Sequence, residues 1–198
     1  MSSAQNMISS AHPIEDKTTL IDSRGFRFNV GIVLCNRRGR LFWAKRIASD
    51  GWQFPQGGMH KTETPRQAMF RELYEEIGLE PDQVEVLQAT QHWLYYTLPS
   101  RYLRQRPTCI GQRQKWYLLR LQASESHVQF DKTSKPEFGD YKWVDYWHPL
   151  DSVVYFKQGV YHQVLNEFSS AVEKLRWKSE KRKTYFKKQH ARENHNSN

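Results

Sequence analysis

Residues 57–79 read GGMHKTETPRQAMFRELYEEIGL, and this stretch determines the local fold around it. Thr64 and Pro65 predict a helix start, because a threonine oxygen caps free backbone N–H groups and proline suits the first helical position. Gln67 lies at the capping-box spacing from Thr64, and Gly78 supplies a stop. The sequence therefore predicts a helix that follows a glycine-rich turn and ends before Gly78.

Two chemically different faces are expected on this helix, at ~100° per residue. One is apolar and carries Phe70, Leu73, Tyr74 and Ile77; the other is acidic and carries Glu72, Glu75 and Glu76. Three carboxylates within one turn repel one another unless a cation neutralises them. Hard oxygen ligands without His or Cys suit Mg²⁺, with Mn²⁺ as a substitute, and Mg²⁺ is commonly shared with substrate phosphates. A solvated acidic face balanced by neighbouring arginines is the alternative for this pattern taken alone.

The spacing of these residues resembles the signature of the Nudix hydrolases, G-x5-E-x7-R-E-U-x-E-E-x-G-U, where U is a bulky apolar residue. The matching positions are Gly57, Glu63, Arg71, Glu72, Leu73, Glu75, Glu76, Gly78 and Leu79. The resemblance implies a divalent-metal-dependent enzyme that hydrolyses a phosphoric anhydride bond, in a nucleoside diphosphate linked to another group. It also implies an α/β (α+β) fold, the Nudix α/β/α sandwich around a mixed β-sheet.

The same resemblance assigns roles to individual residues. Metal ligands would be the carbonyl of Gly57 and the carboxylates of Glu72, Glu75 and Glu76. Glu72 would also orient or deprotonate the attacking water. Glu63 and Arg71 would brace the loop against the helix, so the expected catalytic set is Glu63, Arg71, Glu72 and Glu76.

Other stretches resemble a narrower group, the bacterial RNA pyrophosphohydrolases and their relatives, the dinucleoside polyphosphate hydrolases. These stretches are residues 21–27, 29–33, 52–58, 111–117, 136–138 and 153–157. Enzymes of that group remove pyrophosphate from triphosphorylated or diphosphorylated RNA 5′ ends, which promotes mRNA decay. RNA 5′ ends are therefore the expected partner, with no DNA and no membrane, and the sequence leaves the existence of a protein activator open.

This narrower resemblance extends the expected site beyond the helix. Glu137 would add a metal ligand from a loop, with an ordinary turn glutamate as the alternative. Residues expected to contact substrate are Arg27, Arg46, Tyr96, Gln114, Lys115, Val154 and Phe156. For each of these, a surface charge or a packed aromatic side chain is the alternative interpretation.

Cations and aromatic residues alternate in the second half of the chain, where they could pair with phosphates and stack on unpaired bases. They are Tyr95, Tyr96, Arg101, Tyr102, Arg104, Arg106, Arg113, Lys115, Trp116 and Tyr117. From Gln112 to Leu121 the same alternation is typical of a half-buried strand, in which Trp116 would pack rather than stack.

Length and charge indicate one catalytic domain with extensions. We expect a flexible segment at 1–20, the domain at 21–176, and a basic, disordered tail at 177–198. Of the net charge of +9, residues 173–198 carry nine cations and three acids, and nine minus three leaves +6. Such a tail either stays solvated or raises RNA affinity by counterion release.

Apolar runs predict strands at 28–35, 41–44, 84–93 and 116–121, and a second amphipathic helix follows Phe156. No apolar run approaches the ~20 residues that cross a bilayer. The start of the chain lacks the pattern of a secretory signal, so we expect a cytoplasmic location.

Three functions compete on the sequence alone. The first is an RNA 5′ pyrophosphohydrolase that leaves a 5′-monophosphate. The second, a hydrolase of diadenosine polyphosphates or free nucleotides, would use the same metals and the same glutamates. The third is a non-catalytic module that binds RNA ends, and the full set of signature glutamates disfavours it.

Overall fold

The computed structural model describes residues 20–103 and 109–195, with the side chains at 101, 102 and 182–195 left out of the description. The strands are β1 (Phe26–Cys35), β2 (Leu41–Arg46), β3 (Trp52–Gln53), β4 (Gln56–Gly58), β5 (Val84–Ala89), β6 (Leu94–Thr97), β7 (Gly111–Leu121) and β8 (Phe138–Val144). The helices are α1 (Pro65–Ile77), α2 (Ser100–Leu103), α3 (His148–Ser152) and α4 (Gln158–His195). Short 3₁₀ turns lie at Pro81–Gln83, Glu125–His127 and Tyr155–Lys157.

The eight strands of the described chain form one mixed sheet with the path β3-β2-β1-β7-β5. Its centre is the parallel pairing of β1 with β7, which runs from Phe26 opposite Gly111 to Cys35 opposite Arg120. The short strand β4 pairs antiparallel with β1 and places Gly57 opposite Val30. This pairing holds the glycine-rich turn against the middle of the sheet.

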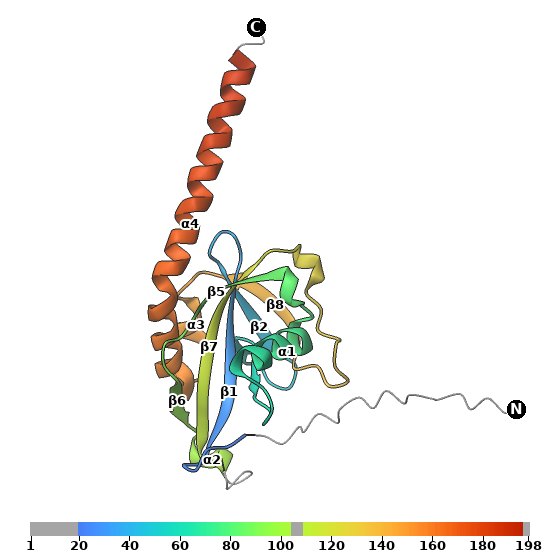
Figure 1. Ribbon diagram of the computed structural model, residues 1–198, viewed down its shortest axis with the longest axis vertical. Helices are drawn as coiled ribbons and strands as arrows, with labels where there is room; N and C mark the ends of the chain where they lie inside the picture. The colour runs from blue at the N-terminus through green and yellow to red at the C-terminus, as the bar shows by residue number, and fades with distance from the viewer. Residues whose placement is uncertain (1–19, 104–108, 196–198) are drawn as a thin grey trace, which may run out of the picture.

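Helices cover both faces of the sheet, with α1 on one side and α3 and α4 on the other (Figure 1). Alternate residues of β1 point to the two sides: Val30, Ile32 and Leu34 pack in the core under α1, and Val33 and Cys35 pack in the core under α4. The expected α/β/α sandwich around a mixed sheet is confirmed.

The boundaries of α1 follow the local sequence signals. Thr64 Oγ1 accepts from the Gln67 amide at 3.3 Å, and Gln67 Oε1 accepts from the Thr64 amide at 2.9 Å, which completes the capping box. Gly78 adopts φ 74°, and its amide donates to the Tyr74 carbonyl. The predicted start and stop of this helix are confirmed.

The faces of α1 differ from the expectation. The buried residues are Ala68, Met69, Glu72, Leu73, Glu76 and Ile77, whereas Tyr74 is 38% exposed. Two of the three signature glutamates are therefore buried, because the glycine-rich turn and β4 cover the side of the helix that carries them. The prediction of an acidic face opposite the buried face was wrong, since periodicity does not show what packs on the second side.

The predicted strand at 84–93 is shorter in the structure, where β5 ends at Ala89 and a separate strand, β6, begins at Leu94. The segment β5 pairs with the second half of β7 and β6 pairs with its first half, so the chain leaves the sheet at Thr90–Trp93 and re-enters it. Four strands were not expected. β6 begins one residue after the predicted strand ends, β3 and β4 are too short to show a period, and β8 contains Gly139 and Asp140, which disfavour strands. Pairing with β2 makes the last of these a strand.

The second predicted helix is confirmed as α4, and its apolar residues from Val160 to Leu175 are buried under the sheet. Where we expected disorder after residue 176, the same helix continues to His195. The reason is composition: the segment contains no proline and no glycine after Gly159, and it is rich in Lys, Glu, Arg and Gln. The expected segment 1–20 lies almost wholly outside the described residues. Within the described residues no helix combines the length and apolarity needed to cross a membrane.

Candidate active site

Arg71 organises the turn of α1 that carries the glutamates. Its guanidinium donates to Glu63 on the preceding loop, with Nη2 3.0 Å from Oε2, and to the Gly58 carbonyl at 2.8 Å. Nη1 also donates to Glu72 at 2.8 Å and to Glu75 at 3.0 Å. One buried cation thus ties three carboxylates to the glycine-rich turn.

These contacts shift the acid–base properties of the pair that braces the loop. Burial opposes the charge on Glu63, but hydrogen bonds from Arg71 and from the His60 amide outweigh it and lower the pKa of Glu63. Burial likewise opposes the charge on Arg71, and its carboxylate partners raise the pKa of the guanidinium. Both groups are therefore held ionised, as a structural ion pair requires.

Glu72 and Gly57 are in direct contact. A Cβ built on Gly57 would overlap the carboxylate of Glu72, so only glycine fits between β4 and α1 at this position. The carboxylate is 8% exposed, and burial raises the pKa of Glu72 to about 7 despite the neighbouring Arg71.

Glu76 lies one helical turn further on and is buried deeper. Its Oε2 accepts from the Gln56 amide at 2.8 Å. Burial, followed by the negative charges of Glu72 and Glu137, raises the pKa of Glu76 well above its usual value. Glu137 comes from the loop before β8 and lies close enough to Glu76 to affect its pKa, so residues far apart in sequence form one acidic cluster.

The donor atoms of this cluster suit a divalent cation. Glu72 and Glu137 are close enough to Glu76 to raise its pKa, and the donor atoms of all three side chains are hard oxygens. Among the described residues, no group of three or more acidic, histidine or cysteine side chains is arranged so that it could hold a metal ion. The Gly57 carbonyl, water and substrate oxygens would therefore have to complete the coordination, as is usual for Mg²⁺.

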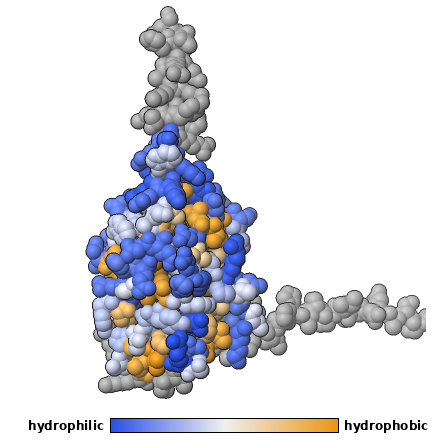
Figure 2. Space-filling view, turned by 60° about the vertical axis from the view of Figure 1, so that its left-hand side comes forward, coloured by the Kyte–Doolittle hydropathy of each residue, from blue (hydrophilic) through white to orange (hydrophobic). Residues whose placement is uncertain are grey.

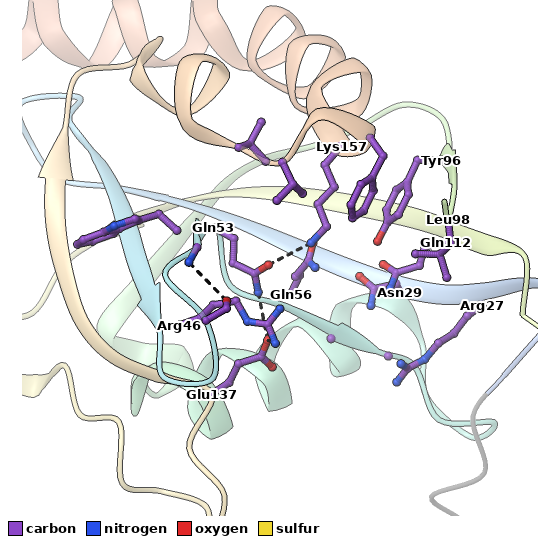
Figure 3. A pocket seen from close by; sticks show the side chains of 18 of the residues that line it. Arg27, Asn29, Arg46, Gln53, Gln56, Tyr96, Leu98, Gln112, Glu137 and Lys157 are labelled. Carbon is purple, nitrogen blue, oxygen red and sulfur yellow. Dashed lines mark hydrogen bonds and ion pairs between the residues drawn. The ribbon is translucent and has the colours of Figure 1, made fainter. Parts of the chain in front are cut away.

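A pocket of about 770 Å³ opens beside the acidic cluster, between the sheet and the start of α4. It brings together eight of the expected site residues: Arg27, Arg46, Gly57, Glu72, Tyr96, Glu137, Val154 and Phe156. Figure 3 shows Arg46 and Glu137 at one end of the pocket and Arg27 at the other. Cations thus flank a wall that carries carboxylates.

A hydrogen-bonded chain crosses the pocket from the start of α4 to the acidic cluster (Figure 3). Lys157 Nζ donates to Gln53 Oε1 at 3.0 Å, and Gln53 Nε2 donates to Glu137 Oε1 at 3.1 Å. Lys157 is 7% exposed, and burial together with the nearby Arg46 lowers its pKa to about 8. Arg46 forms a second contact to Glu137, at 3.3 Å.

An apolar and aromatic wall faces these polar groups. The rings of Tyr96 and Phe156 lie with centroids 5.7 Å apart, and Val154 beside them is 44% exposed. Burial raises the pKa of Tyr96, which therefore stays neutral. The wall offers a flat, uncharged surface on which a nucleobase could stack.

Two expected substrate contacts do not line the pocket. Gln114 is buried beneath its floor, where Nε2 donates to Asn29 at 3.0 Å and to Gln112 at 2.9 Å. Lys115 is directed to the loop at Gln91, whose carbonyl accepts from Nζ at 3.1 Å. Gln114 can act only through the polar side chains that it holds, and Lys115 is separate from the pocket.

Some of the aromatic residues that alternate with cations in and near β7 pack in the core and are not available to stack on bases. Trp116 is fully buried and packs edge-on against Phe54 and Tyr161, which confirms the packing interpretation. Arg104 and Arg106 lie outside the described residues, as do the side chains of Arg101 and Tyr102.

Sequence reasoning missed several polar residues of the pocket, namely Asn29, Gln53, Gln56, Gln112 and Lys157. A signal was available for two of them. Gln53 interrupts an otherwise apolar segment, and Lys157 ends an apolar run just before a helix, so each is a polar residue at a position expected to be buried. The other three became visible only once β1, β4 and β7 were paired.

Comparison with known proteins identifies the family of this chain. The NUDIX domain model matches residues 25–164. A protein of Shewanella sediminis named RNA pyrophosphohydrolase is 53% identical over 152 residues, which cover 76% of this chain and 88% of that protein. One of Psychrobacter sp. with the same name is 55% identical over 153 residues, covering 76% and 88%.

Solved structures show the same fold at low sequence identity. The E. coli dihydroneopterin triphosphate pyrophosphohydrolase gives a TM-score of 0.58 at 20% identity, over 71% of this chain and 95% of that one. A C. elegans Ap4A hydrolase gives 0.56 at 18% identity, over 74% and 97%. The NUDIX model covers more than half of the sequence, and relatives at about 53% identity match 76% of it, so this chain belongs to the Nudix family.

Proposed function

We propose that this protein is an RNA 5′ pyrophosphohydrolase. It converts the triphosphate or diphosphate at an RNA 5′ end to a monophosphate, releases pyrophosphate or phosphate, and thereby promotes mRNA decay in the cytoplasm. The observation that carries the proposal is the pocket, in which buried carboxylates, two arginines and an aromatic wall meet. The name shared by relatives at about 53% identity supports the RNA substrate.

The proposed cofactor is Mg²⁺, with Mn²⁺ as a substitute. The residues that would hold it are Gly57, through its carbonyl, and Glu72, Glu75, Glu76 and Glu137. When bound, the cation would screen the phosphate charge, lower the pKa of bound water and stabilise the leaving oxygen.

The chain's own residues bind and orient the 5′ end. Arg27 and Arg46 at opposite ends of the pocket would contact phosphate oxygens, and Tyr96, Val154 and Phe156 would hold a base near the 5′ end. Glu72 would orient the attacking water or take its proton. Glu63 and Arg71 keep Glu72 in place, because the brace fixes both the helix and the glycine-rich turn.

The test is release of phosphate from a short 5′-triphosphorylated RNA in the presence of Mg²⁺, beside diadenosine tetraphosphate at equal concentration. Glu76→Gln protein serves as the control, since it keeps the shape of the side chain and loses its charge. We expect preferential conversion of the RNA to a 5′-monophosphate, dependent on Glu76. Preference for the dinucleotide would be consistent with the same catalytic site but would identify the protein as a nucleotide hydrolase.

A further inference from the structure

A second cationic surface lies away from the pocket, where α4 leaves the domain. We call it the basic platform and define it by the exposed or half-exposed cations of the β1–β2 turn and of α4: Arg37, Arg38, Arg40, Lys174, Arg176, Lys178 and Lys181. Figure 2 shows that hydrophilic residues cover this end of the molecule. The NUDIX domain model stops at residue 164, so the helical half of the platform lies beyond it.

The turn and the helix are held together as one surface. Arg176 Nε donates to the Arg38 carbonyl at 3.3 Å. Gly39 has φ +70°, and a Cβ placed on it would come within 2.7 Å of Arg176 Cγ and 2.9 Å of Val172 Cγ1. The close packing of Gly39 against α4 therefore fixes the arginines of the turn beside the lysines of the helix.

The charge of the platform is largely uncompensated. Arg40 lies 3.6 Å from Asp145, whereas no described acidic side chain forms an ion pair with Arg37, Arg38, Lys174 or Lys178. Four acids lie near the seven cations: Asp145, Glu173 and Glu180 of α4, and Glu125, which lines the same hollow as the arginines of the turn, so seven minus four leaves +3. Such a concentration of like charge costs stability unless a polyanion binds to it.

A hollow and an exposed aromatic side chain accompany these charges. The three arginines of the turn line a hollow of about 360 Å³ together with Glu125 and Trp143, and Trp143 Nε1 has no hydrogen-bond partner among the described residues. On the helix, Trp177 is 57% exposed, and Lys181 Nζ lies 3.9 Å from its ring centroid. A cation beside an exposed indole is a surface on which unpaired bases stack while phosphates pair with the charge.

We propose that the basic platform is a second RNA-binding surface that holds the phosphodiester backbone of the substrate downstream of its 5′ end. This inference rests on the proposed RNA substrate. The helix rises ~1.5 Å per residue, so Lys178 lies roughly 30 Å along α4 from its start beside the pocket. A dinucleotide in the pocket cannot reach the platform, whereas a longer unpaired RNA can contact both.

The experiment compares a long, unpaired 5′-triphosphorylated RNA with a triphosphorylated dinucleotide. The full-length variant carries Arg37→Gln, Arg38→Gln, Lys174→Gln and Lys178→Gln. We expect its KM for the long RNA to rise about tenfold, with kcat unchanged and both constants unchanged for the dinucleotide. Single-stranded binding loses ~0.7 in salt slope per neutralised phosphate, so the slope of log affinity against log salt for the long RNA should fall by up to about 3.

The matched control keeps every charge and changes every side chain: Arg37→Lys, Arg38→Lys, Lys174→Arg and Lys178→Arg. Because the effect is electrostatic, this variant should behave as wild type. If the glutamine variant and the wild type had equal KM values for the long RNA and the same salt slope, the proposal that the platform binds RNA would be overturned. The RNA 5′ activity would be unaffected by that result. If the wild type released neither pyrophosphate nor phosphate from either RNA, the proposed function would instead be overturned, and platform-dependent binding of long RNA would still support the platform.

Discussion

The carboxylate of Glu72 lies against the backbone of Gly57, at the point where α1 crosses the glycine-rich turn. Any side chain at position 57 would overlap that carboxylate. Both residues line the pocket, and Glu72 also belongs to the acidic cluster, so this contact lies where the cluster meets the pocket. The glycine is therefore required by close approach of the helix, independently of its φ angle.

Gly57→Ala should lower kcat by ~100-fold or more, because displacement of a catalytic group by about 1 Å has effects of this size. The measurement is steady-state turnover with Mg²⁺, alongside circular dichroism to verify folding. Gly159→Ala is the matched control, since a Cβ there meets nothing within 4 Å. Normal turnover in Gly57→Ala would mean that Glu72 can move without loss.

Glu76→Gln should lower turnover by orders of magnitude and leave the fold intact. The substitution removes one negative charge from a buried cluster that contains Glu72 and Glu137, while an amide oxygen can still accept from the Gln56 amide. The melting temperature of the metal-free protein should therefore stay the same or rise. A folded Glu76→Gln protein with near-normal turnover would contradict the metal-ligand assignment.

Arg71→Lys should destabilise the metal-free protein by about 2 kcal/mol, because a lysine cannot reach Glu63, Glu72 and the Gly58 carbonyl at the same time. Urea unfolding measures this loss. Arg66→Lys, at an exposed position of the same helix, should change the free energy of unfolding by less than ~0.5 kcal/mol. Equal effects at the two positions would show that the brace contributes no specific stability.

Lys157 predicts a pH dependence of stability. Its pKa falls to about 8 in the folded protein from the ordinary value of 10.5, chiefly through burial. Between these values the unfolded chain binds the proton and the folded chain does not, so stability rises with pH, by roughly 1 kcal/mol per unit. Below pH 8 both states are protonated, and the full cost of the buried charge is present.

Denaturant unfolding of the metal-free protein from pH 7 to 10 measures this effect. Lys157→Met lacks the titrating amine, so the stability difference between the variant and the wild type should be largest below pH 8 and should shrink as the pH rises. Tyrosines and Cys35 titrate in both proteins and cancel in the difference. A difference that is constant across the range would refute the buried-charge explanation.

Phe156→Ala should impair hydrolysis of triphosphorylated RNA more than hydrolysis of a small dinucleotide. The ring of Phe156 stacks near Tyr96 on the apolar wall of the pocket, and base stacking on an aromatic ring contributes ~1–3 kcal/mol. The measurement is kcat/KM for both substrates, so that the dinucleotide serves as the internal control. Equal losses on both would remove Phe156 from the base-binding role.

Much of the site could be predicted because its residues are close in sequence. The spacing of Glu63, Arg71, Glu72 and Glu76 along one loop and one helix determines the brace, and helical geometry converts that spacing into a contact. The capping signals of α1 are local in the same sense. Glu137 was reached only by resemblance, because its distance from Glu76 depends on how β8 pairs with β2.

The other differences between the predictions and the structure also arise from contacts between segments that are distant in sequence. Periodicity placed Glu72 and Glu76 on a face opposite the buried one, and the glycine-rich turn buries them. It extended one strand to residue 93, whereas β5 ends at Ala89. The resemblance proposed Lys115 and, more weakly, Gln114 as substrate contacts, and the pleat of β7 buries Gln114 beneath the pocket and turns Lys115 away from it.

The sequence alone determined the parts of the proposed reaction machinery that are local: the helix, its caps, the brace and the signature carboxylates, all of which depend on neighbours within 23 residues of chain. Only the tertiary structure decided the pocket, in which Lys157, Gln53 and Glu137 form a continuous hydrogen-bonded chain. It also decided the basic platform, where Arg38 and Arg176 meet across the chain. Local spacing specifies local contacts, whereas contacts between distant segments require the sheet and the packing of α4 upon it.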